Sequence, residues 1–288
     1  MIHWLCQHKT RFSVRGCTAV CIILLVLLLA WGDVSIVSSH GIVIRSHFIQ
    51  GDVPSYPNDP VWETIAPIPI PLSGQIITRP VWPEPSVRVL SVRSVHNGKD
   101  IAFLLEWRDA TKNERLTPGV FRDGAAVAFP LGTAPAFFCM GQLDHYVNIW
   151  HWKADWQSDV DRRAARAKER KRKRGGIRRF EVIPRRPSSV EDLIGGGFST
   201  LTSKKQQGRV KGQAEWKRGF WRVVMKRELS KPNEIPENEA LLFPGRLQAI
   251  SFAVWNGENK ERNGQKAVAS WIQLQIDPVN EESGATNR

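Results

Sequence analysis

Cysteine is scarce in this 288-residue chain, and its positions exclude whole classes of protein. Cys6, Cys17 and Cys21 lie in or before a hydrophobic run near the N-terminus, so a processed chain would keep Cys139 alone. A single cysteine cannot form an intramolecular disulfide framework or supply a cysteine-rich zinc or iron–sulfur site. The sequence also lacks Cys-x-x-Cys-His, which excludes covalent attachment of a c-type haem.

Catalytic signatures are also missing. The chain has no Gly-x-Ser-x-Gly, no P-loop, no Gly-x-Gly-x-x-Gly after a strand and no His-Glu-x-x-His. His96, His145 and His151 are scattered, which disfavours a metal site built from them. The paired carboxylates of a glycosidase cannot be picked out, because the central acidic residues all fall in plausible turns. We therefore expect a chain that is not an enzyme by itself.

Positive charge is confined to one segment. The net charge is +13, but residues 162–186 hold thirteen Lys or Arg and two acids, which is +11 of that total. The rest of the chain is nearly neutral, so composition gives no general indication of nucleic-acid binding. Any electrostatic function must belong to this segment, and we expect no nucleic-acid partner.

The N-terminus carries the pattern of a signal peptide. Basic residues precede an apolar run over 19–31, which is shorter than the roughly 20 residues of a membrane span. Cleavage could follow Gly32 or Ser39, and the alternative is an uncleaved anchor formed by residues 19–31. We expect residues 1–39 to be a signal peptide or anchor and the body of the protein to be exported to the periplasm.

The remaining chain predicts an all-β protein. Residues 40–86 form a proline-rich extended segment, in which regular helix is excluded and a short strand is expected over 74–78. Residues 87–278 predict an antiparallel β-sandwich, and 279–288 a polar tail. Asn97-Gly98 is a hairpin signal between the first two strands of the sandwich. The expected strands of the sandwich are 87–94, 101–107, 125–129, 147–156, 220–227, 246–255 and 267–276.

A long basic insertion, 158–214, interrupts this pattern. A short polar helix is expected over 159–173, because Gly175 and Gly176 end the helical pattern. Residues 187–214 hold few large apolar side chains, which predicts a long surface segment. The insertion is either a solvated loop or a docking arm for an acidic partner or anionic surface.

The central stretch, 119–156, suggests a binding pocket. Two apolar strands are joined by a Gly/Pro loop that carries the soft sulfur of Met140, an arrangement suited to a flat apolar group. The simpler alternative is a core hairpin whose methionine fills space. Lys266 precedes the last strand and is either a solvated strand-edge charge or a buried neutral amine that binds a metal. Met140 and Lys266 together would hold a haem iron between them.

Four motifs, in order over about residues 76–276, resemble those of a known family. The motifs are FRDGAAVAFP (121–130), Met140-Gly141 with VNIWHWKADW (147–156), WKRGFWRVV (216–224), and FAVWNG (252–257) with Lys266 and Trp271. Each motif alone is weak, and the set is specific. With them the chain is similar to the haem b-binding gamma subunits of exported molybdenum oxidoreductases: ethylbenzene dehydrogenase, dimethylsulfide dehydrogenase, selenate and chlorate reductases, and the related nitrite oxidoreductase.

The resemblance implies a β-sandwich that holds one non-covalent haem b. Met140 matches the axial methionine, and Lys266 matches the axial lysine better than Lys226 does. It implies an iron–sulfur beta subunit and a molybdopterin alpha subunit as partners, with a soluble cytochrome as one external carrier. The chain would pass single electrons between that complex and the carrier. The other expected cofactor-binding residues are Phe138, Trp150 and Trp255.

The sequence departs from the family pattern at three places. Met225 stands where phenylalanine is usual, Gly124 and Ala125 are smaller than expected in their strand, and the basic insertion is longer than expected.

A second hypothesis, from another class, is a haem-free carbohydrate-binding sandwich. Its stacking platforms would be Trp150, Trp152 and Trp156.

Overall fold

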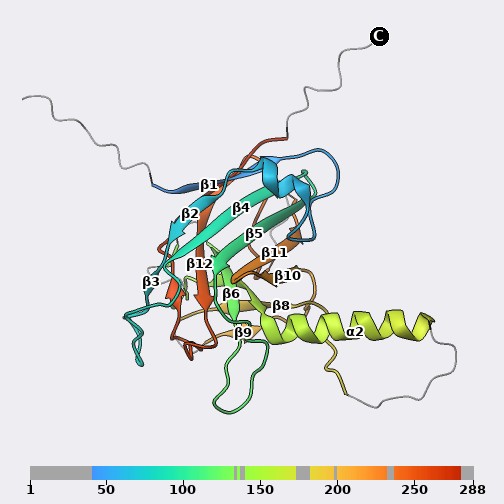
Figure 1. The fold of residues 1–288 in the computed structure, drawn as a ribbon. Coiled ribbons are helices and arrows are strands. Elements are labelled where there is room, and N and C mark those ends of the chain that lie inside the picture. Colours follow the sequence, from blue (N-terminus) through green and yellow to red (C-terminus); the bar gives the residue numbers. More distant parts are fainter. Residues whose placement is uncertain are drawn as a thin grey trace, which may run out of the picture. The chain divides into compact units, whose positions relative to one another are not determined.

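The computed structural model describes residues 41–132, 135–136, 140–172, 182–197, 200–231 and 237–279 (Figure 1). These residues are mostly strands joined by turns, which confirms the predicted all-β class. No helix within the described ranges is long and apolar enough to span a bilayer. The helices among these residues are η1 (Pro60–Thr64, a 3₁₀ helix) and α2 (Ala154–Arg172). The strands are β1 (Val43–Phe48), β2 (Ile68–Pro71), β3 (Ser73–Gly74), β4 (Val89–His96), β5 (Asp100–Arg108), β6 (Gly124–Pro130), β7 (Val147–Lys153), β8 (Val190–Gly195), β9 (Thr202–Ser203), β10 (Lys211–Lys217), β11 (Phe220–Glu228), β12 (Leu247–Trp255), β13 (Ala267–Val268) and β14 (Ile272–Ile276).

The strands form two layers that share β12. The first sheet runs β10-β11-β5-β4-β1-β14 with β2 on β4, and the second runs β12-β6-β7-β8-β9 with β13 and β3. Residues 247–250 of β12 pair with β14 of the first sheet, whereas residues 251–255 pair with β6 of the second. Most pairs are antiparallel, as predicted, but β1 is parallel to both β4 and β14.

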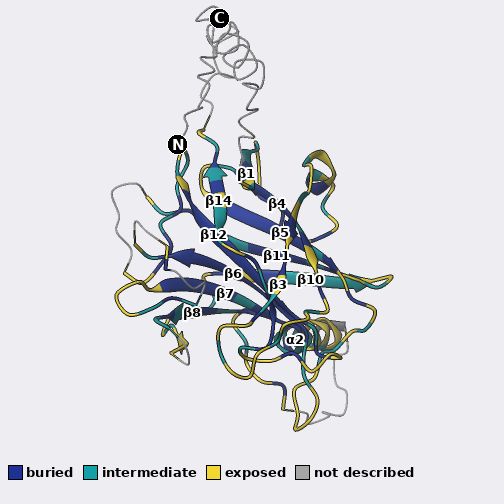
Figure 2. Cartoon of the chain, turned by 90° about the vertical axis from the view of Figure 1, so that its left-hand side faces the viewer, coloured by how far each residue is buried: buried dark blue, intermediate teal, exposed yellow. Residues whose placement is uncertain are grey.

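Aromatic side chains fill the space between the layers. Trp152 of β7 lies 6.1 Å from Trp107 of β5 and 4.9 Å from Trp221 of β11, between ring centroids. Trp150 likewise meets Phe103 of β5 across the interface. The strands are buried along most of their length (Figure 2). A buried aromatic side chain typically removes about 150–250 Å² of surface from water, so these residues dominate the core.

The hairpin predicted at Asn97-Gly98 is present. Oδ1 of Asn97 accepts hydrogen bonds from the backbone N–H groups of Lys99 and Asp100, and Gly98 has φ +82°. This conformation costs little only for glycine, which explains the residue at that position. Met225, which replaces a phenylalanine of the family pattern, is fully buried in the core beside β5. A flexible thioether side chain fills irregular core space well.

The expectation of a surface segment over 187–214 is wrong at β8 and at the start of β10. Residues 190–195 pair with β7 and are largely buried, and residues 211–214 pair with β11. The strand β8 was not predicted from the sequence for two reasons. Its central residue, Asp192, is a charged side chain that is buried because it pairs with Lys204, and glycines follow the strand. The expected polar helix is present as α2, but it begins at residue 154.

Three strand boundaries also differ from prediction. The Trp-rich strand ends at Lys153, where α2 begins. The last predicted strand is split into β13 and β14. The strand expected over 74–78 is reduced to β3, while β2 pairs with β4 despite Pro69 and Pro71. The expected signal segment, 1–39, lies outside the described residues, as does most of the polar tail.

Candidate functional site

The second sheet turns small side chains to its outer face. Side chains alternate along a strand, so β6 points Val127 and Phe129 into the core and Ala126 and Ala128 outward. Ala253 of β12 pairs with Ala126 and widens this surface. The result is a low apolar floor on the outer face of the sheet.

Gly124 continues the floor at the start of β6. A Cβ added there would lie 3.2 Å from Nε2 of His151 and 3.6 Å from Cε3 of Trp255. Its neighbour Ala125 points inward instead, beside Trp152 of β7. The two small residues that depart from the family pattern therefore do different work: Gly124 keeps the floor low, and Ala125 makes room for a core tryptophan.

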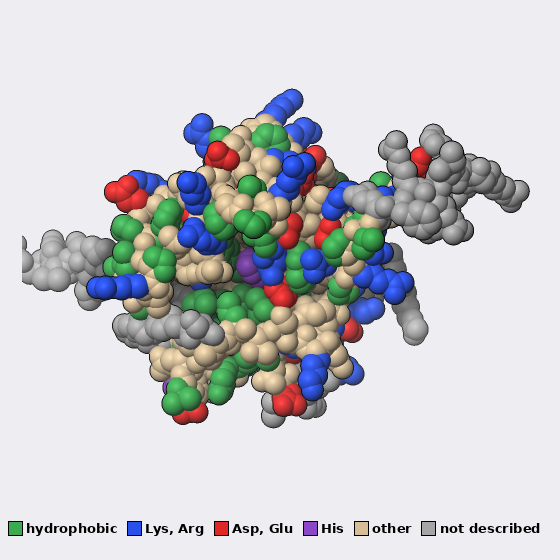
Figure 3. Space-filling view, turned by 90° about the horizontal axis from the view of Figure 1, so that it is seen from below, with side chains coloured by type: hydrophobic (Ala, Val, Ile, Leu, Met, Phe, Trp, Pro, Cys, Tyr) green, Lys and Arg blue, Asp and Glu red, His purple; other side chains and the backbone are tan. Residues whose placement is uncertain are grey.

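A cavity of about 360 Å³ lies over this floor. Loops before β6, between β6 and β7, and between β12 and β13 form its walls, together with β8 and β9. The space-filling view shows a hollow in which hydrophobic side chains lie beside a histidine, with charged side chains around it (Figure 3). The lining includes Leu116, Phe121, Arg122, Ile149, His151, Lys153, Glu191, Leu193, Leu201, Ser203, Ser251, Trp255, Glu261, Arg262, Asn263 and Val268.

Met140 and Lys266 meet inside the cavity. The Nζ atom of Lys266 lies 2.8 Å from Sδ of Met140, although the two residues are 126 positions apart in the sequence. The carbonyl of Met140 accepts a hydrogen bond from N–H of Gly197, just after β8. Lys266 directly precedes β13 and is only 5% exposed. The thioether sulfur of Met140 and the side-chain nitrogen of Lys266 therefore converge at one point.

Of the other residues predicted for this site, some line the cavity and some lie elsewhere in the fold. Trp255 lines the cavity, with Lys266 Nζ 5.2 Å from its ring centroid. Trp150 lies in the core on the opposite face of the sheet, so the structure does not bring it together with Met140. Lys226 also lies apart, because its Nζ contacts Val53 O at 3.1 Å and Asp100 at 3.4 Å. Phe138 is outside the described residues.

His151 is a cavity residue that sequence reasoning missed. Its ring stacks on Trp255, with centroids 4.6 Å apart and planes at 28°. Burial, followed by the positive charges of Lys153, Arg122 and Lys266, lowers the pKa of His151 well below its ordinary value, so the ring is neutral near pH 7. Alternation shows that His151 lies on the face opposite Trp150 and Trp152, but it does not show which of the two faces carries a cavity.

One end of the cavity is ionic. Lys153 pairs with Glu191, and Nη1 of Arg122 lies 2.8 Å from Oδ2 of Asp155. Burial lowers the pKa of Lys153, with Glu191 opposing the change. Burial alone would raise the pKa of Glu191, but hydrogen bonds from Lys153 and Ser203 lower it below its ordinary value. The ionised form of Glu191 is therefore favoured at this end, whereas burial disfavours the charged form of Lys153.

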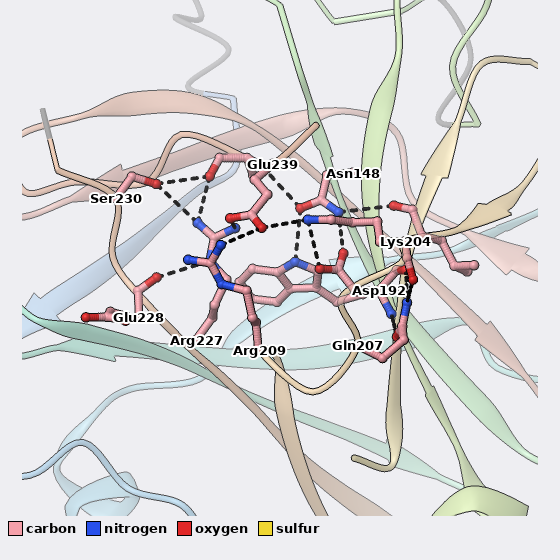
Figure 4. Close-up of polar contacts among 12 residues, drawn as sticks. Asn148, Asp192, Lys204, Gln207, Arg209, Arg227, Glu228, Ser230 and Glu239 are labelled. Carbon is pink, nitrogen blue, oxygen red and sulfur yellow. Dashed lines mark hydrogen bonds and ion pairs between the residues drawn. The ribbon is translucent and has the colours of Figure 1, made fainter. Parts of the chain in front are cut away.

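Directly behind the cavity wall, the inner face of β8 holds a buried ionic network (Figure 4). Lys204 Nζ lies 3.1 Å from Asp192 and 2.7 Å from Glu239. The guanidinium of Arg227 lies 5.1 Å from the ring of Trp150, and burial lowers the pKa of Arg227 to about 10. The network ties β7, β8 and β11 together, and so fixes the strand that carries Glu191.

Two buried acids outside the predicted site position the cavity loops. Glu261, 1% exposed, accepts hydrogen bonds from Trp82 Nε1, Ser86 and the backbone of Asn256. It thereby fastens the loop that ends in Lys266 to the proline-rich segment. The sequence gives no sign of this part, because Glu261 lies among the charged residues of an apparent surface turn.

Asp123, just before β6, plays the same part on the other side. Its carboxylate accepts hydrogen bonds from the backbone of Gly257 at 2.8 Å and Asn113 at 2.7 Å, and from Trp221 Nε1 at 2.9 Å. Burial, with the nearby Asp109, raises the pKa of Asp123 to about 7. The aspartate of the Phe-Arg-Asp motif thus joins the core to the cavity loops.

The stacking platform of the carbohydrate hypothesis is absent from the described surface. Trp150 and Trp152 are both fully buried. Trp156 is half-buried between Lys153 Nζ at 4.5 Å and the Arg186 guanidinium at 4.3 Å from its ring centroid. No row of exposed rings therefore forms along this strand and helix.

Comparison with solved structures gives low similarity. A family 9 carbohydrate-binding module of Caldicellulosiruptor kristjanssonii in complex with glucose aligns at 10% identity, with 84% of this chain and all of that one covered. The TM-score is 0.43, which is too low to carry an argument about this chain.

Relatives in sequence are more informative. A candidate respiratory nitrate reductase heme subunit of Haloferax mediterranei is 28% identical over 94% of this chain and 87% of its own length. The chlorate reductase gamma subunit of Ideonella dechloratans is 29% identical over 65% and 64%. The dimethylsulfide dehydrogenase gamma subunit of Rhodovulum sulfidophilum is 25% identical over 78% and 76%. The ethylbenzene dehydrogenase family profile matches residues 59–267, well over half of the sequence, and the chain therefore belongs to that family.

Proposed function

We propose that this chain is the electron-transfer subunit of a molybdenum oxidoreductase complex and that it holds one haem b in the outer cavity. The observation that carries the proposal is the convergence of Met140 Sδ and Lys266 Nζ, 2.8 Å apart, in that cavity. The relatives named as gamma or heme subunits of nitrate reductase, chlorate reductase and dimethylsulfide dehydrogenase support it.

The cavity residues suit such a group. Its volume of about 360 Å³ lies within the range of ligand sites, and its floor of glycine and alanine leaves room for a flat ring. Thioether sulfur is a known axial ligand of haem, and a lysine amine can donate its lone pair in its neutral form. Met140 and Lys266 are therefore the residues that would hold the iron.

The haem would supply a one-electron carrier, and the protein supplies its environment. Met140 and Lys266 would select the metal through their lone pairs. Trp255, stacked on His151, closes one side of the cavity and limits access of water. The hydrogen bonds to Glu261 keep the Lys266 loop in place. Axial ligand identity and burial are two of the means by which a protein adjusts haem potential, and these residues would supply both.

The partners of the proposed subunit are an iron–sulfur beta subunit and a molybdopterin alpha subunit. A soluble cytochrome is the proposed external carrier. Helix α2 begins directly after Lys153 of the cavity wall and extends away from the sheets, with its cations concentrated toward its C-terminal end (Figure 1). We place the docking surface for an acidic carrier there. The body would work in the periplasm, with residues 19–31 acting in export or as an anchor.

The proposal is tested by supplying haem to the purified full chain and extracting and typing what it retains. One non-covalent haem b per chain with a low-spin spectrum is expected. Lys266→Ala should perturb that spectrum strongly, whereas Lys226→Ala should leave it unchanged, because Lys226 contacts Val53 and Asp100 instead. A folded chain that retains no haem would overturn the proposal, and equal effects of the two variants would refute the choice of Lys266.

A further inference from the structure

The cavity has an apolar end and a cationic end. The outward residues of β7 show the gradient, since Ile149 lies at one end of the floor and Lys153 at the other. Leu193 and Ala128 flank Ile149 in register. At the Lys153 end, Arg122 enters from the loop before β6 and contacts Asp155. Arg262, from the loop before Lys266, lies over the ring of Phe121, the residue before Arg122, with its guanidinium 4.6 Å from the ring centroid.

Positive charge exceeds negative charge in this lining. Leaving out Lys266, whose amine is neutral in the proposed function, its cations are Arg122, Lys153 and Arg262, and its carboxylates are Glu191 and Glu261, an excess of one formal charge. Glu261 is also committed to backbone and side-chain donors of the surrounding loops. An anionic ligand is the chemical complement of such a cavity.

Arg122 has hydrogen-bonding capacity that its protein partners do not use. A guanidinium carries five N–H donors, and within the described residues its side chain donates one hydrogen bond, from Nη1 to Asp155. The side chain is 20% exposed and lines the cavity. Its planar fork matches a carboxylate in two-point geometry, which a lysine cannot provide.

We infer that the cationic end formed by Arg122, Lys153 and Arg262 is a subsite for carboxylate groups of the ligand. The inference rests on the proposed function, in which those groups are the two propionates of haem b. The apolar end around Ile149 and Leu193 then receives the edge of the ring that carries no charge. The polarity of the cavity thus fixes which edge of an asymmetric porphyrin enters at which end.

The experiment compares ferric haem b with its dimethyl ester, in which both carboxylates are neutral. The full chain is stripped of haem and titrated with each compound, followed by the Soret absorbance. The wild-type chain should bind the ester more weakly by about tenfold to a hundredfold, the worth of a charge-assisted hydrogen bond. Arg122→Gln should lower the affinity for haem toward that for the ester and leave the affinity for the ester unchanged.

Two variants control the measurement. Arg222→Gln removes a cation of similar exposure, 28% against 20%, from the outer face of the first sheet, where its Nε contacts Glu106 at 2.8 Å. It should leave both affinities unchanged. Arg122→Lys keeps the charge but loses the planar fork, so it should restore part of the affinity lost in Arg122→Gln.

The outcomes separate this inference from the function on which it rests. Equal affinity of the wild-type chain for haem and its ester would overturn the carboxylate subsite while leaving the haem site intact. The same conclusion would follow if Arg122→Gln weakened both compounds equally. Failure of a folded wild-type chain to bind either compound would overturn the proposed function and the subsite together.

Discussion

The two faces of β6 and β7 differ sharply, although the same strands make both. The inner face carries Phe129, Trp150 and Trp152, which pack against aromatic residues of the first sheet. The outer face carries Ala126 and Ala128 and leaves a cavity. Because side chains alternate with a period of two, neighbouring positions in one sequence motif serve stability and binding separately.

This separation explains how a stable sandwich can keep an open cavity. The inner face supplies the buried apolar area that folding requires. The outer face can therefore carry small side chains without loss of the fold. On the outer face of the first sheet, by contrast, Val53 and Trp62 of the proline-rich segment cover Leu104 and Val224. One outer face is covered by the chain itself, and the other keeps an open cavity.

The largest effect is expected on the inner face. Trp150→Ala should destabilise the fold by about 3–5 kcal/mol, because the removed ring leaves a cavity between Phe129 and Phe103 and exposes Arg227 to it. Chemical denaturation of the wild-type and variant chains measures the difference. A loss below about 1 kcal/mol would contradict the placement of Trp150 in the core.

Asp123, which joins both faces, should make stability depend on pH. Its pKa is about 7 in the folded chain and near the ordinary 3.8 when unfolded. A raised folded pKa contributes stability that is complete at low pH and is lost as pH rises through about 7. Because a difference of one in pKa between the folded and unfolded chains corresponds to about 1.36 kcal/mol, the loss should approach roughly 4 kcal/mol.

Denaturation curves measured from about pH 4 to about pH 8, a range that spans most of the interval between the unfolded and folded pKa values of Asp123, test this expectation. Stability of the wild-type chain should fall across this range, whereas Asp123→Asn, which cannot ionise there, should show a flatter profile. The variant is expected to be less stable at low pH, since its amide cannot accept from Gly257, Asn113 and Trp221 together. A profile unchanged by the substitution would rule out Asp123 as the source.

Ala125 and Ala126 provide the sharpest matched pair. Ala126→Leu raises the outer floor and should weaken haem binding by about tenfold or more with little change in stability. Ala125→Leu overpacks the core beside Trp152 and should cost about 1–3 kcal/mol while haem affinity is kept. Haem titration and denaturation are measured on both variants. If both variants changed haem affinity and stability in the same way, the assignment of Ala125 to the core face and Ala126 to the cavity face would be contradicted.

The smallest effect concerns the basic helix. If the C-terminal part of α2 docks an acidic carrier, association should weaken as salt rises, because the Debye length falls from about 10 Å at 0.1 M to 3 Å at 1 M. Replacing Lys168, an exposed residue of α2, by glutamate should weaken association further, while the same change at Lys217 of β10 serves as a control. Salt-independent binding would argue against this docking surface.

Local sequence pattern was sufficient to predict part of the fold and part of the site. Alternation and Asn97-Gly98 predicted the main strands and their hairpin, and motif resemblance selected Met140 and Lys266. Pattern could not show that Trp150 faces the core, because period-two alternation gives two faces without saying which is buried against the other sheet. The buried strand β8 was not predicted for a related reason. A charged residue such as Asp192 can be recognised as a core residue only when its ion-pair partner, Lys204, is known.

His151, Glu261 and Asp123 were missed as site residues for a further reason. Their parts depend on contacts between segments far apart in the chain: Glu261 with Trp82, Asp123 with Gly257, and His151 with Trp255. Such pairings follow from sheet order, which no single-sequence pattern encodes.

The most direct test of the central claim is an oxidised-minus-reduced absorption spectrum of the haem-supplied chain and of Met140→Ala. Sharp low-spin bands in the wild-type chain, shifted or lost in the variant, are the predicted result. Identical low-spin spectra for the two chains would contradict ligation by Met140, and with it the assignment of the cavity where Met140 meets Lys266.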